Sequence, residues 1–582
     1  MKLNRDFNFL IFTILIFGAF LRFYKIDWGD GYFFHPDEYH IVNSVNRLSF
    51  PTQMNPNFFS YGSFTIYLIY FTKLVLLKLG FSVNYPSVFF IGRIYSALFS
   101  TLSLFVVFYL TKRLTKKTNI SMLVTFLTAI TPGLIQQAHF ATPESSLMFW
   151  LFLTIYLVVS WLEHKNRKLL YLSAITLGVA SAVKIVAITF LPIYGLLMFD
   201  YGKIFSKYFV RKVKSLFMIV ALICITFFIF FPYSFLDWEH FRSSLNYEGS
   251  VANGSQVVFY TRQFINTVPI IFQFQKILPY SLGPALLVFG LLGFLVLAQN
   301  IIGAFKKIPS FQPEDELNAH MSSYFRGNRV HNKSAGDVIK KSLPHAVIFL
   351  GFVLFFLSNS LLFAKWARFI APTFPFWAIF TGLFIDKLEA TGKKKLANIV
   401  TITTIFVTVF WSTMFFSIYT KKDIRVSATN WVQENIKPDS LFLTEARNML
   451  EVPLAGNYKK VTFDFYDLDQ NPKMLNELSK NLGEADYFII QGRRIYKNHQ
   501  RLAAQYPLVN NFYTNLFQGT LGFTKLIEFT SYPQLSFVGM SFEITDEDAE
   551  ETWSVFDHPR IIVYKKEYNL EKEKLLSILK GR

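Results

Sequence analysis

The sequence predicts a multi-span α-helical membrane domain over residues 1–420 and a soluble α/β domain over residues 421–582. The composition gives the first indication: 52% of the 582 residues are hydrophobic and only 17% are charged, against roughly 25% in a typical soluble domain. Apolar runs long enough to cross a bilayer recur up to about residue 420, whereas charged residues are common beyond it.

The net charge of +19 is explained by basic loops between the apolar runs, such as 111–117 and 164–168. Such loops mark the cytoplasmic side of a membrane protein, so we expect no nucleic-acid partner. The single cysteine, Cys224, lies in an apolar run and excludes an intramolecular disulfide. No small-residue cleavage site follows the first apolar run, and we expect it to remain as an uncleaved span.

The apolar runs, oriented by the basic loops, predict about eleven transmembrane helices. They are placed at residues 7–24, 90–110, 120–136, 145–162, 216–231, 277–299, 343–363, 369–385 and 396–419, with two short crossings within 169–199. The run 61–79 does not fit this alternation and is expected to lie as a juxtamembrane segment on the outer surface, with Lys73 and Lys78 reaching head groups. The scheme predicts a multi-pass cell-membrane protein in contact with lipid, with a cytoplasmic N-terminus and an extracytoplasmic C-terminal domain.

Two long loops within the membrane part and a mixed sheet in the C-terminal part are also predicted. A long polar loop is expected outside at 232–276 and a basic, flexible loop inside at 306–341. In the C-terminal part, strand-like and helix-like segments alternate, which predicts a mixed sheet. Strands are expected at 440–444, 461–465 and 487–490, and helices at 426–436, 472–482 and 568–579.

On this topology, ionisable residues collect at the outer ends of the spans: Asp37, Glu38, Arg93, His139, Glu144, Lys184, Lys365 and Arg368. Simple alternatives exist, since Asp37 and Glu38 suit a solvated loop, basic residues snorkel to head groups, and His139 suits an interfacial hydrogen bond. Lys184, however, interrupts a nearly unbroken apolar run, which indicates a function. Cations beside carboxylates suit a lipid-phosphate substrate, because the cations hold the phosphate while a carboxylate activates an acceptor.

An ordered set of short stretches resembles a known family. The stretches are Pro36-Asp37-Glu38-Tyr39, Tyr61-Gly62-Ser63-Phe64, Gly92-Arg93-Ile94, His139-Phe140-Ala141-Thr142-Pro143-Glu144, Gly178-Val179-Ala180-Ser181-Ala182-Val183-Lys184 and Arg368-Phe369-Ile370-Ala371-Pro372. In this order they resemble the polyprenyl-phosphate-dependent glycosyltransferases of the GT-C superfamily, of the dolichyl-phosphate-mannose protein mannosyltransferase and aminoarabinose transferase type. Phe556-Asp557-His558-Pro559 resembles a segment of prokaryotic members.

The resemblance implies inverting transfer of one sugar, such as the hexose mannose, from a polyprenyl or dolichyl phosphate to a protein, lipid or glycan acceptor outside the cell. It implies that Asp37 is the general base, that Glu38 orients the acceptor or supports Asp37, and that Glu144 is a second acidic site, where an Asp is more usual. The donor phosphate would be held by Lys184, Arg93 and Arg368. Absence of a WWDYG-like motif, expected in related oligosaccharyltransferases, favours a single-sugar donor.

Members of this family differ in metal dependence. Asp37, His139 and Glu144 are the candidate ligands for a possible divalent metal, which the sequence does not assign. A transporter or flippase of a lipid-linked or anionic substrate is the main alternative function, and a non-catalytic scaffold is another. A transporter would place charges at mid-membrane and show inverted repeats, whereas here the charges gather at one face and no repeat is visible.

Overall fold

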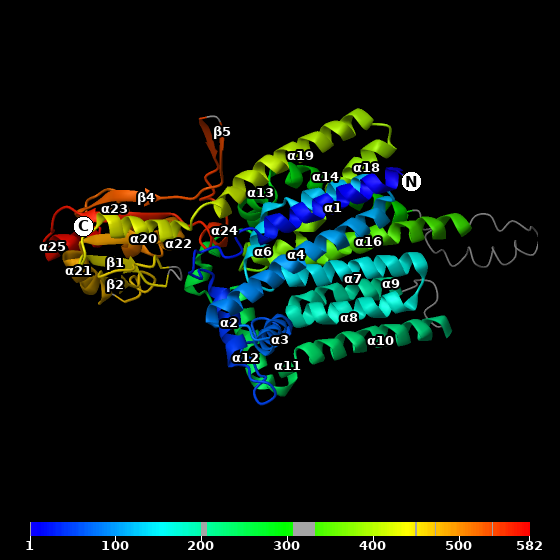
Figure 1. The fold of residues 1–582 in the computed structure, drawn as a ribbon, viewed down its shortest axis with the longest axis horizontal. Helices are drawn as coiled ribbons and strands as arrows, with labels where there is room; N and C mark the ends of the chain where they lie inside the picture. Colours follow the sequence, from blue (N-terminus) through cyan, green and yellow to red (C-terminus); the bar gives the residue numbers. More distant parts are fainter. Residues whose placement is uncertain are drawn as a thin grey trace, which may run out of the picture.

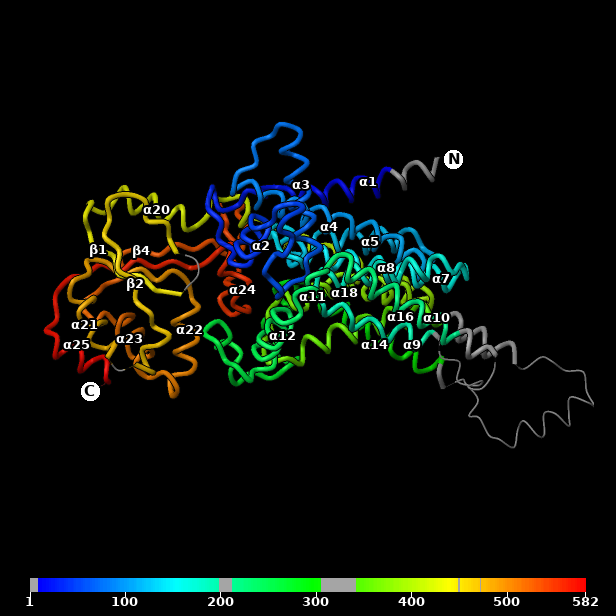
Figure 2. The backbone as a smooth tube through the Cα atoms, turned by 90° about the horizontal axis from the view of Figure 1, so that it is seen from below, coloured from blue at the N-terminus to red at the C-terminus, as the bar shows by residue number. Residues whose placement is uncertain are grey.

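The computed structural model describes residues 2–198, 207–306, 332–447, 451–471, 473–537 and 539–581. A bundle of long helices forms one half of the molecule, and a unit built on a β-sheet lies beyond one end of it (Figure 1). The N-terminus lies at the far end of the bundle, and the C-terminus lies at the opposite extremity of the molecule (Figures 1 and 2). The predicted flexible loop at 306–341 falls mainly on 307–331, outside the described residues.

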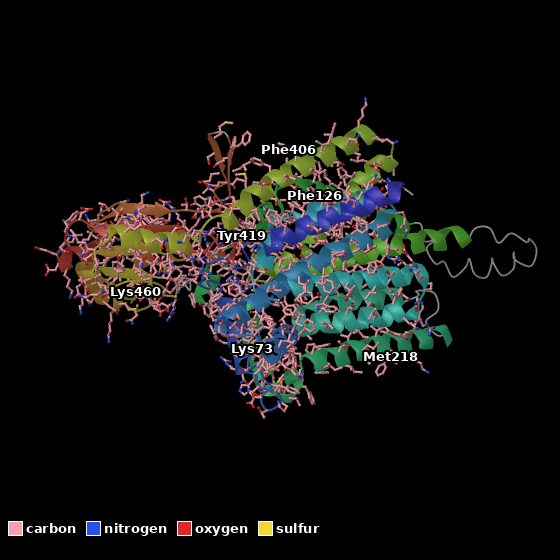
Figure 3. The ribbon with its side chains drawn as sticks, viewed as in Figure 1. Lys73, Phe126, Met218, Phe406, Tyr419 and Lys460 are labelled. Atoms are coloured by element: carbon pink, nitrogen blue, oxygen red, sulfur yellow. The ribbon has the colours of Figure 1, made fainter. Side chains whose placement is uncertain are left out.

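Every predicted span coincides with a helical segment. The segments are α1 (Lys2–Phe23), α4 (Tyr85–Thr115), α5 (Thr118–Ala129) with α6 (Pro132–His139), α7 (Glu144–His164), α8 (Arg167–Val183), η1 (Ile185–Phe190) with α9 (Leu191–Met198), α10 (Lys207–Phe230), α14 (Pro284–Lys306), α16 (Asn332–Ser360), α17 (Ala367–Ile370) and η4 (Ala371–Thr373) with α18 (Phe374–Ala390), and α19 (Lys394–Phe416). Seven described helices are long and apolar enough to cross a membrane, or eight if the bent pair α5–α6 is one span. Figure 3 shows Met218 and Phe406 pointing away from the bundle, and 49% and 71% of these side chains are exposed, as expected for a lipid-facing surface.

Two breaks in the bundle have a local cause. Pro132 begins α6 and cannot continue the hydrogen bonds of α5, so the two helices bend by 54°. Lys184 ends α8 in an extended conformation, and the chain returns through η1 and α9. The residues of the two predicted short crossings within 169–199 form α8 before Lys184 and η1 with α9 after it, and the lysine lies at the turn between them.

Short helices cover the end of the bundle nearest the sheet (Figure 1). They are α2 (Pro36–Arg47), α3 (Phe64–Lys78), α11 (Tyr233–Leu236), α12 (Trp238–Asn253), η2 (Phe259–Phe264), η3 (Gln273–Ile277) and α13 (Leu278–Leu282). The run 61–79 forms α3, which has 15 residues, shorter than the other long apolar helices, and packs against α2 and α4. The expected polar loop at 232–276 is largely helical, because α12 buries Phe241 and Val251 along one face.

The residues beyond 420 form the sheet-containing half of the molecule and are called the C-terminal half here. They contain the predicted mixed sheet, with strand order β2-β1-β3-β7-β4. Strand β1 pairs in parallel with β2 and β3, and β7 pairs antiparallel with β3 and β4. The strands are β1 (Leu441–Glu445), β2 (Lys459–Phe463), β3 (Tyr487–Ile490), β4 (Phe523–Phe529) and β7 (Ile561–Lys566); the helices are α20 (Ile424–Asn435), α21 (Met474–Glu484), α22 (Arg494–Arg501), α23 (Pro507–Phe517) and α25 (Lys572–Leu579). A separate hairpin, β5 (Gln534–Phe537) and β6 (Met540–Glu543), and the short α24 (Glu551–Ser554) lie near the bundle (Figure 1).

Candidate active site between the helix bundle and the C-terminal sheet

A cavity of about 490 Å³ lies where the end of the bundle meets the C-terminal half. This volume is within the range of roughly 300–1,000 Å³ that small-molecule sites occupy. Its polar lining includes Asp37, Tyr61, Lys184 and Arg368. The remaining wall is largely apolar. It comes from the segment before α3, from η1, from the residue after α10, from α12, and from α17 with the residues before it: Phe58, Phe59, Ile185, Val186, Phe231, Phe241, Leu245, Val251, Leu362, Trp366 and Phe369.

Asp37 is positioned by the start of α2. Pro36 occupies the first helical turn, where its missing N–H costs nothing, and His35 accepts a hydrogen bond from the Asp37 backbone N–H at its Nδ1 atom. The carboxylate of Asp37 accepts a hydrogen bond from the Tyr61 hydroxyl at 2.8 Å and forms an ion pair with Arg368. Burial alone would raise the pKa of Asp37, but the charge of Arg368, the His35 ring and the Tyr61 hydroxyl outweigh it, so the pKa lies below its ordinary value.

Lys184 reaches the same cavity from the break between α8 and η1. Its Nζ atom lies 3.0 Å from Oε1 of Glu144, 5.3 Å from the Tyr61 ring centre and 5.0 Å from the Phe369 ring centre. Glu144 itself is buried behind the lysine, and its Oε2 atom has no hydrogen-bond partner within the described chain. Glu144 therefore orients Lys184 and does not line the cavity as a second acid.

A close backbone approach sets Tyr61 and Lys184 side by side. The Gly62 N–H donates to the Val183 carbonyl at 3.0 Å, and a Cβ atom on Gly62 would lie 1.9 Å from the Ala182 carbonyl oxygen. Only glycine permits this contact, which joins the segment before α3 to the end of α8.

Arg93 and Glu38, predicted to hold the donor phosphate and to orient the acceptor or support Asp37, do not line the cavity. Both side chains are fully buried, and the guanidinium binds both Glu38 oxygens at 2.9 and 2.8 Å. Arg93 also donates to the Ile26 and Trp28 carbonyls, and Glu38 accepts from the Ala141 N–H. The positive charge of Arg93 is thus used inside the protein and is not presented to a donor phosphate. Glu38 fixes α2 and so supports Asp37, the second of its two predicted roles.

His139, a candidate metal ligand, is held by contacts inside the protein. Its two ring nitrogens each lie 2.8 Å from a backbone carbonyl oxygen, those of Ile135 and Tyr24, and its ring stacks on Tyr419 with centres 3.9 Å apart. Asp37, His139 and Glu144 are not brought together, and no group of three or more His, Cys, Asp or Glu side chains suited to a metal occurs in the described ranges.

The C-terminal half supplies a wall of the cavity that sequence reasoning missed. Arg494, Thr552 and Phe556 line it, and Arg494 forms a buried ion pair with Glu551. The Glu550 carboxylate accepts hydrogen bonds from the Ala367 N–H at 3.1 Å and from Gln263 at 2.7 Å. Since Ala367 precedes Arg368, Glu550 positions the cation that pairs with Asp37. The only sequence signal in this segment is the resemblance at 556–559.

A buried charged cluster attaches this segment to the bundle. The His558 ring lies between Asp546 and Asp557, and Asp557 accepts hydrogen bonds from the Tyr419 hydroxyl at 2.8 Å and from Gln136 at 3.1 Å. Tyr419 stands at the junction of α19 and the C-terminal half (Figure 3). Burial would lower the pKa of His558, but the two carboxylates outweigh it and raise the pKa to about 10.

We therefore expect alkaline pH to weaken this attachment. Because the pKa of His558 is higher in the folded protein than the ordinary 6.5, its contribution to stability is complete below about pH 6.5 and is lost as pH rises through about 10. The measurement is the thermal unfolding temperature of wild type and of His558→Gln at several pH values between 7 and 10. The difference between the two proteins is compared across pH, because titration of other groups affects both proteins equally. The advantage of wild type should shrink with pH; a constant difference would contradict the assignment.

The comparisons with known proteins agree with this architecture. Residues 13–241 match the family model described as dolichyl-phosphate-mannose-protein mannosyltransferase. The solved oligosaccharyltransferase of Archaeoglobus fulgidus in its apo form is 13% identical over 87% of this chain and 72% of that chain, with a TM-score of 0.51. No curated protein sequence matches the chain.

Two further structures are similar at lower scores. ArnT from Cupriavidus metallidurans bound to undecaprenyl phosphate is 13% identical over 97% of this chain and 98% of its own, with a TM-score of 0.47. The S. cerevisiae Pmt1–Pmt2 complex bound to the sugar donor is 18% identical over 47% of this chain and 38% of its own, with a TM-score of 0.32. Residues 13–241, which include Asp37 and Lys184, are thus similar to the mannosyltransferase family, and the chain shares the overall fold of the archaeal enzyme.

Proposed function

We propose that this enzyme transfers a single sugar, a hexose such as mannose, from a polyprenyl or dolichyl phosphate to a protein, lipid or glycan acceptor, with inversion at the sugar. The observation that carries the proposal is the meeting of Asp37 with the cations Lys184 and Arg368 in a single cavity at the end of the membrane bundle. Glu248, which accepts a hydrogen bond from Ser60, and Arg494, which pairs with Glu551, line the same cavity. The type of donor also follows the mannosyltransferase family that residues 13–241 match.

A lipid-linked donor fits the surroundings of the cavity. Its apolar wall includes Phe231, which directly follows α10, and the neighbouring Phe228 and Ile229 are 44% and 64% exposed on the lipid-facing side. A polyprenyl chain can therefore lie along α10 while its phosphate remains beside the two cations. Charged groups held in such a partly dry site act strongly on a phosphate, because little water screens them.

The chemistry assigned to these residues is a single displacement. The acceptor hydroxyl or amine attacks the sugar C1 atom while the Asp37 carboxylate takes its proton. The bond between C1 and the phosphate oxygen breaks, and its electron pair stays on the departing lipid phosphate. Lys184 and Arg368 stabilise the added negative charge. Because attack and departure occur on opposite faces of C1, the configuration inverts.

Arg368 links donor binding to the base. It pairs with Asp37 and thereby keeps the pKa of that carboxyl low. A donor phosphate that shares the guanidinium would raise the pKa of Asp37 and make it a stronger base when substrate is bound. Tyr61 keeps the carboxylate oriented through its hydrogen bond at 2.8 Å.

The site and the C-terminal half are assigned to the extracytoplasmic face of the cell membrane, with the N-terminus in the cytoplasm. Helix α4 packs against α3 and ends at Thr115, so the basic loop at 111–117 begins about 39 Å along the helix from its first residue, Tyr85. The positive-inside rule places that loop in the cytoplasm and the cavity outside.

Lys184→Gln should lower kcat/KM for the donor by about 10²–10³-fold, because it removes a charge from the departing phosphate. The assay follows labelled sugar transferred from a polyprenyl-phosphate donor by the purified protein in lipid. Lys365→Gln is the matched control, since Lys365 bonds to Thr267 and the Phe363 carbonyl outside the cavity. Equal losses in both variants would contradict the assignment, and donor crossing the membrane without sugar transfer would favour a flippase.

A further inference from the structure

The hairpin β5–β6 stands apart from the five-stranded sheet (Figure 1). Its register pairs Leu535 with Phe542 and Phe537 with Met540. Cross-strand partners share a face and alternate residues share a face, so these four apolar side chains lie on one side. The opposite side carries only polar residues: Gln534, Ser536, Ser541 and Glu543.

The described protein leaves most of the apolar side of the hairpin exposed, and only Leu535 is partly buried. Phe537, Met540 and Phe542 are 67%, 58% and 50% exposed. A two-stranded hairpin by itself is marginally stable in water, and such a concentration of exposed apolar side chains marks an interaction surface. A hairpin with one apolar and one polar side suits the boundary between an apolar phase and water.

The hairpin is attached to the C-terminal end of α19, which is one of the candidate membrane spans. The Gln534 N–H donates to the Ser417 hydroxyl at 3.1 Å, and the Phe542 ring lies 6.4 Å from that of Phe410. Earlier on α19, Ile402 and Phe406 are 66% and 71% exposed on the lipid-facing side. The apolar side of the hairpin is thus continuous with the lipid-facing surface of α19.

We propose that the β5–β6 hairpin is an interfacial membrane anchor, with its apolar side in the bilayer surface beside α19 and its polar side towards water. Lys421 and Lys422 follow the end of this helix, at the depth where basic side chains meet lipid phosphates. Lipid is favoured over a second protein because the same surface of α19 already requires lipid contact.

The anchor also has a consequence for the cavity. The chain that leaves β6 continues directly into Asp546 and Glu550, which attach the C-terminal half to the bundle and position Ala367. Anchoring this chain on both sides, in the membrane and on the bundle, restricts the motion of the cavity wall formed by Thr552 and Phe556. The anchor does not depend on which sugar is transferred.

The test measures depth in the membrane at single positions of the full-length protein. Cys224 is first replaced by serine, and Phe537→Cys or the matched Ser541→Cys on the polar side is labelled with bimane. The proteins are placed in nanodiscs of phosphatidylcholine and phosphatidylglycerol in equal amounts. Quenchers are iodide in water, and nitroxide-labelled lipids with the nitroxide near the head group or deep in the acyl chain.

The label at position 537 should be quenched several-fold more by shallow nitroxide lipids than the label at 541, and iodide should show the reverse order. Equal iodide quenching at both positions would overturn the proposal. Protection of position 537 from both iodide and nitroxide lipids would also overturn it and would indicate a second copy or another protein instead. Since Phe537→Cys could itself weaken the anchor, bimane on Leu535→Cys and on Ser536→Cys provides an independent pair, in which position 535 should behave like 537 and position 536 like 541.

Discussion

Asp37→Asn should lower the rate of sugar transfer by about 10²–10⁴-fold, the usual contribution of a general base. The amide has nearly the same shape and still accepts the hydrogen bond from Tyr61, but it cannot take a proton from the acceptor. The measurement is kcat at saturating donor and acceptor, so that the chemical step is compared and not substrate binding. Donor affinity should change much less than kcat, because Lys184 and Arg368 remain in place.

Asp27→Asn is the matched control for this variant. Asp27 is an exposed carboxylate in the loop that precedes α2 and does not line the cavity, so its replacement should leave kcat unchanged. Equal product from wild type and Asp37→Asn would remove Asp37 from the reaction. A loss of folded protein would be separated from a loss of catalysis by comparing the unfolding temperatures of both variants.

Arg93→Met and Glu38→Gln should each reduce the free energy of unfolding by about 3–5 kcal/mol, because each leaves an uncompensated partner in a fully buried pair. The measurement is denaturant unfolding in a fixed micelle or nanodisc. The double variant Glu38→Met with Arg93→Met should recover much of that loss, since a buried ion pair is often replaceable by apolar side chains of similar size.

The two adjacent carboxylates, Asp37 and Glu38, should therefore differ in what their replacement impairs, catalysis for Asp37 and stability for Glu38. Glu38 variants that fold at low temperature should retain most of their kcat, whereas folded Asp37→Asn should not. If Arg93→Met were as stable as wild type and instead impaired donor binding alone, Arg93 would be a phosphate ligand after all, and the roles assigned to the pair would be wrong.

The sequence alone determined the elements of this protein that depend on local pattern. Apolar length and basic loops located the long helices of the bundle, and the mismatch of residues 61–79 with that alternation set α3 apart from them. A single cation within an apolar run indicated the break at Lys184, because burying an unpaired charge in lipid is costly. Alternating patterns located three strands of the mixed sheet. Each of these signals lies within a few residues of the element that it predicts.

Tertiary structure alone decided which charged residues form the site. Asp37 and Glu38 are neighbours in the sequence, but successive residues point about 100° apart on a helix. One therefore meets Arg368, 331 residues away, and the other meets Arg93, 55 residues away. The same holds for Glu550, which positions Ala367 across 183 residues. Local pattern carries no information about such distant partners, and it is the partner that leaves one carboxylate at the cavity and makes the other part of the core.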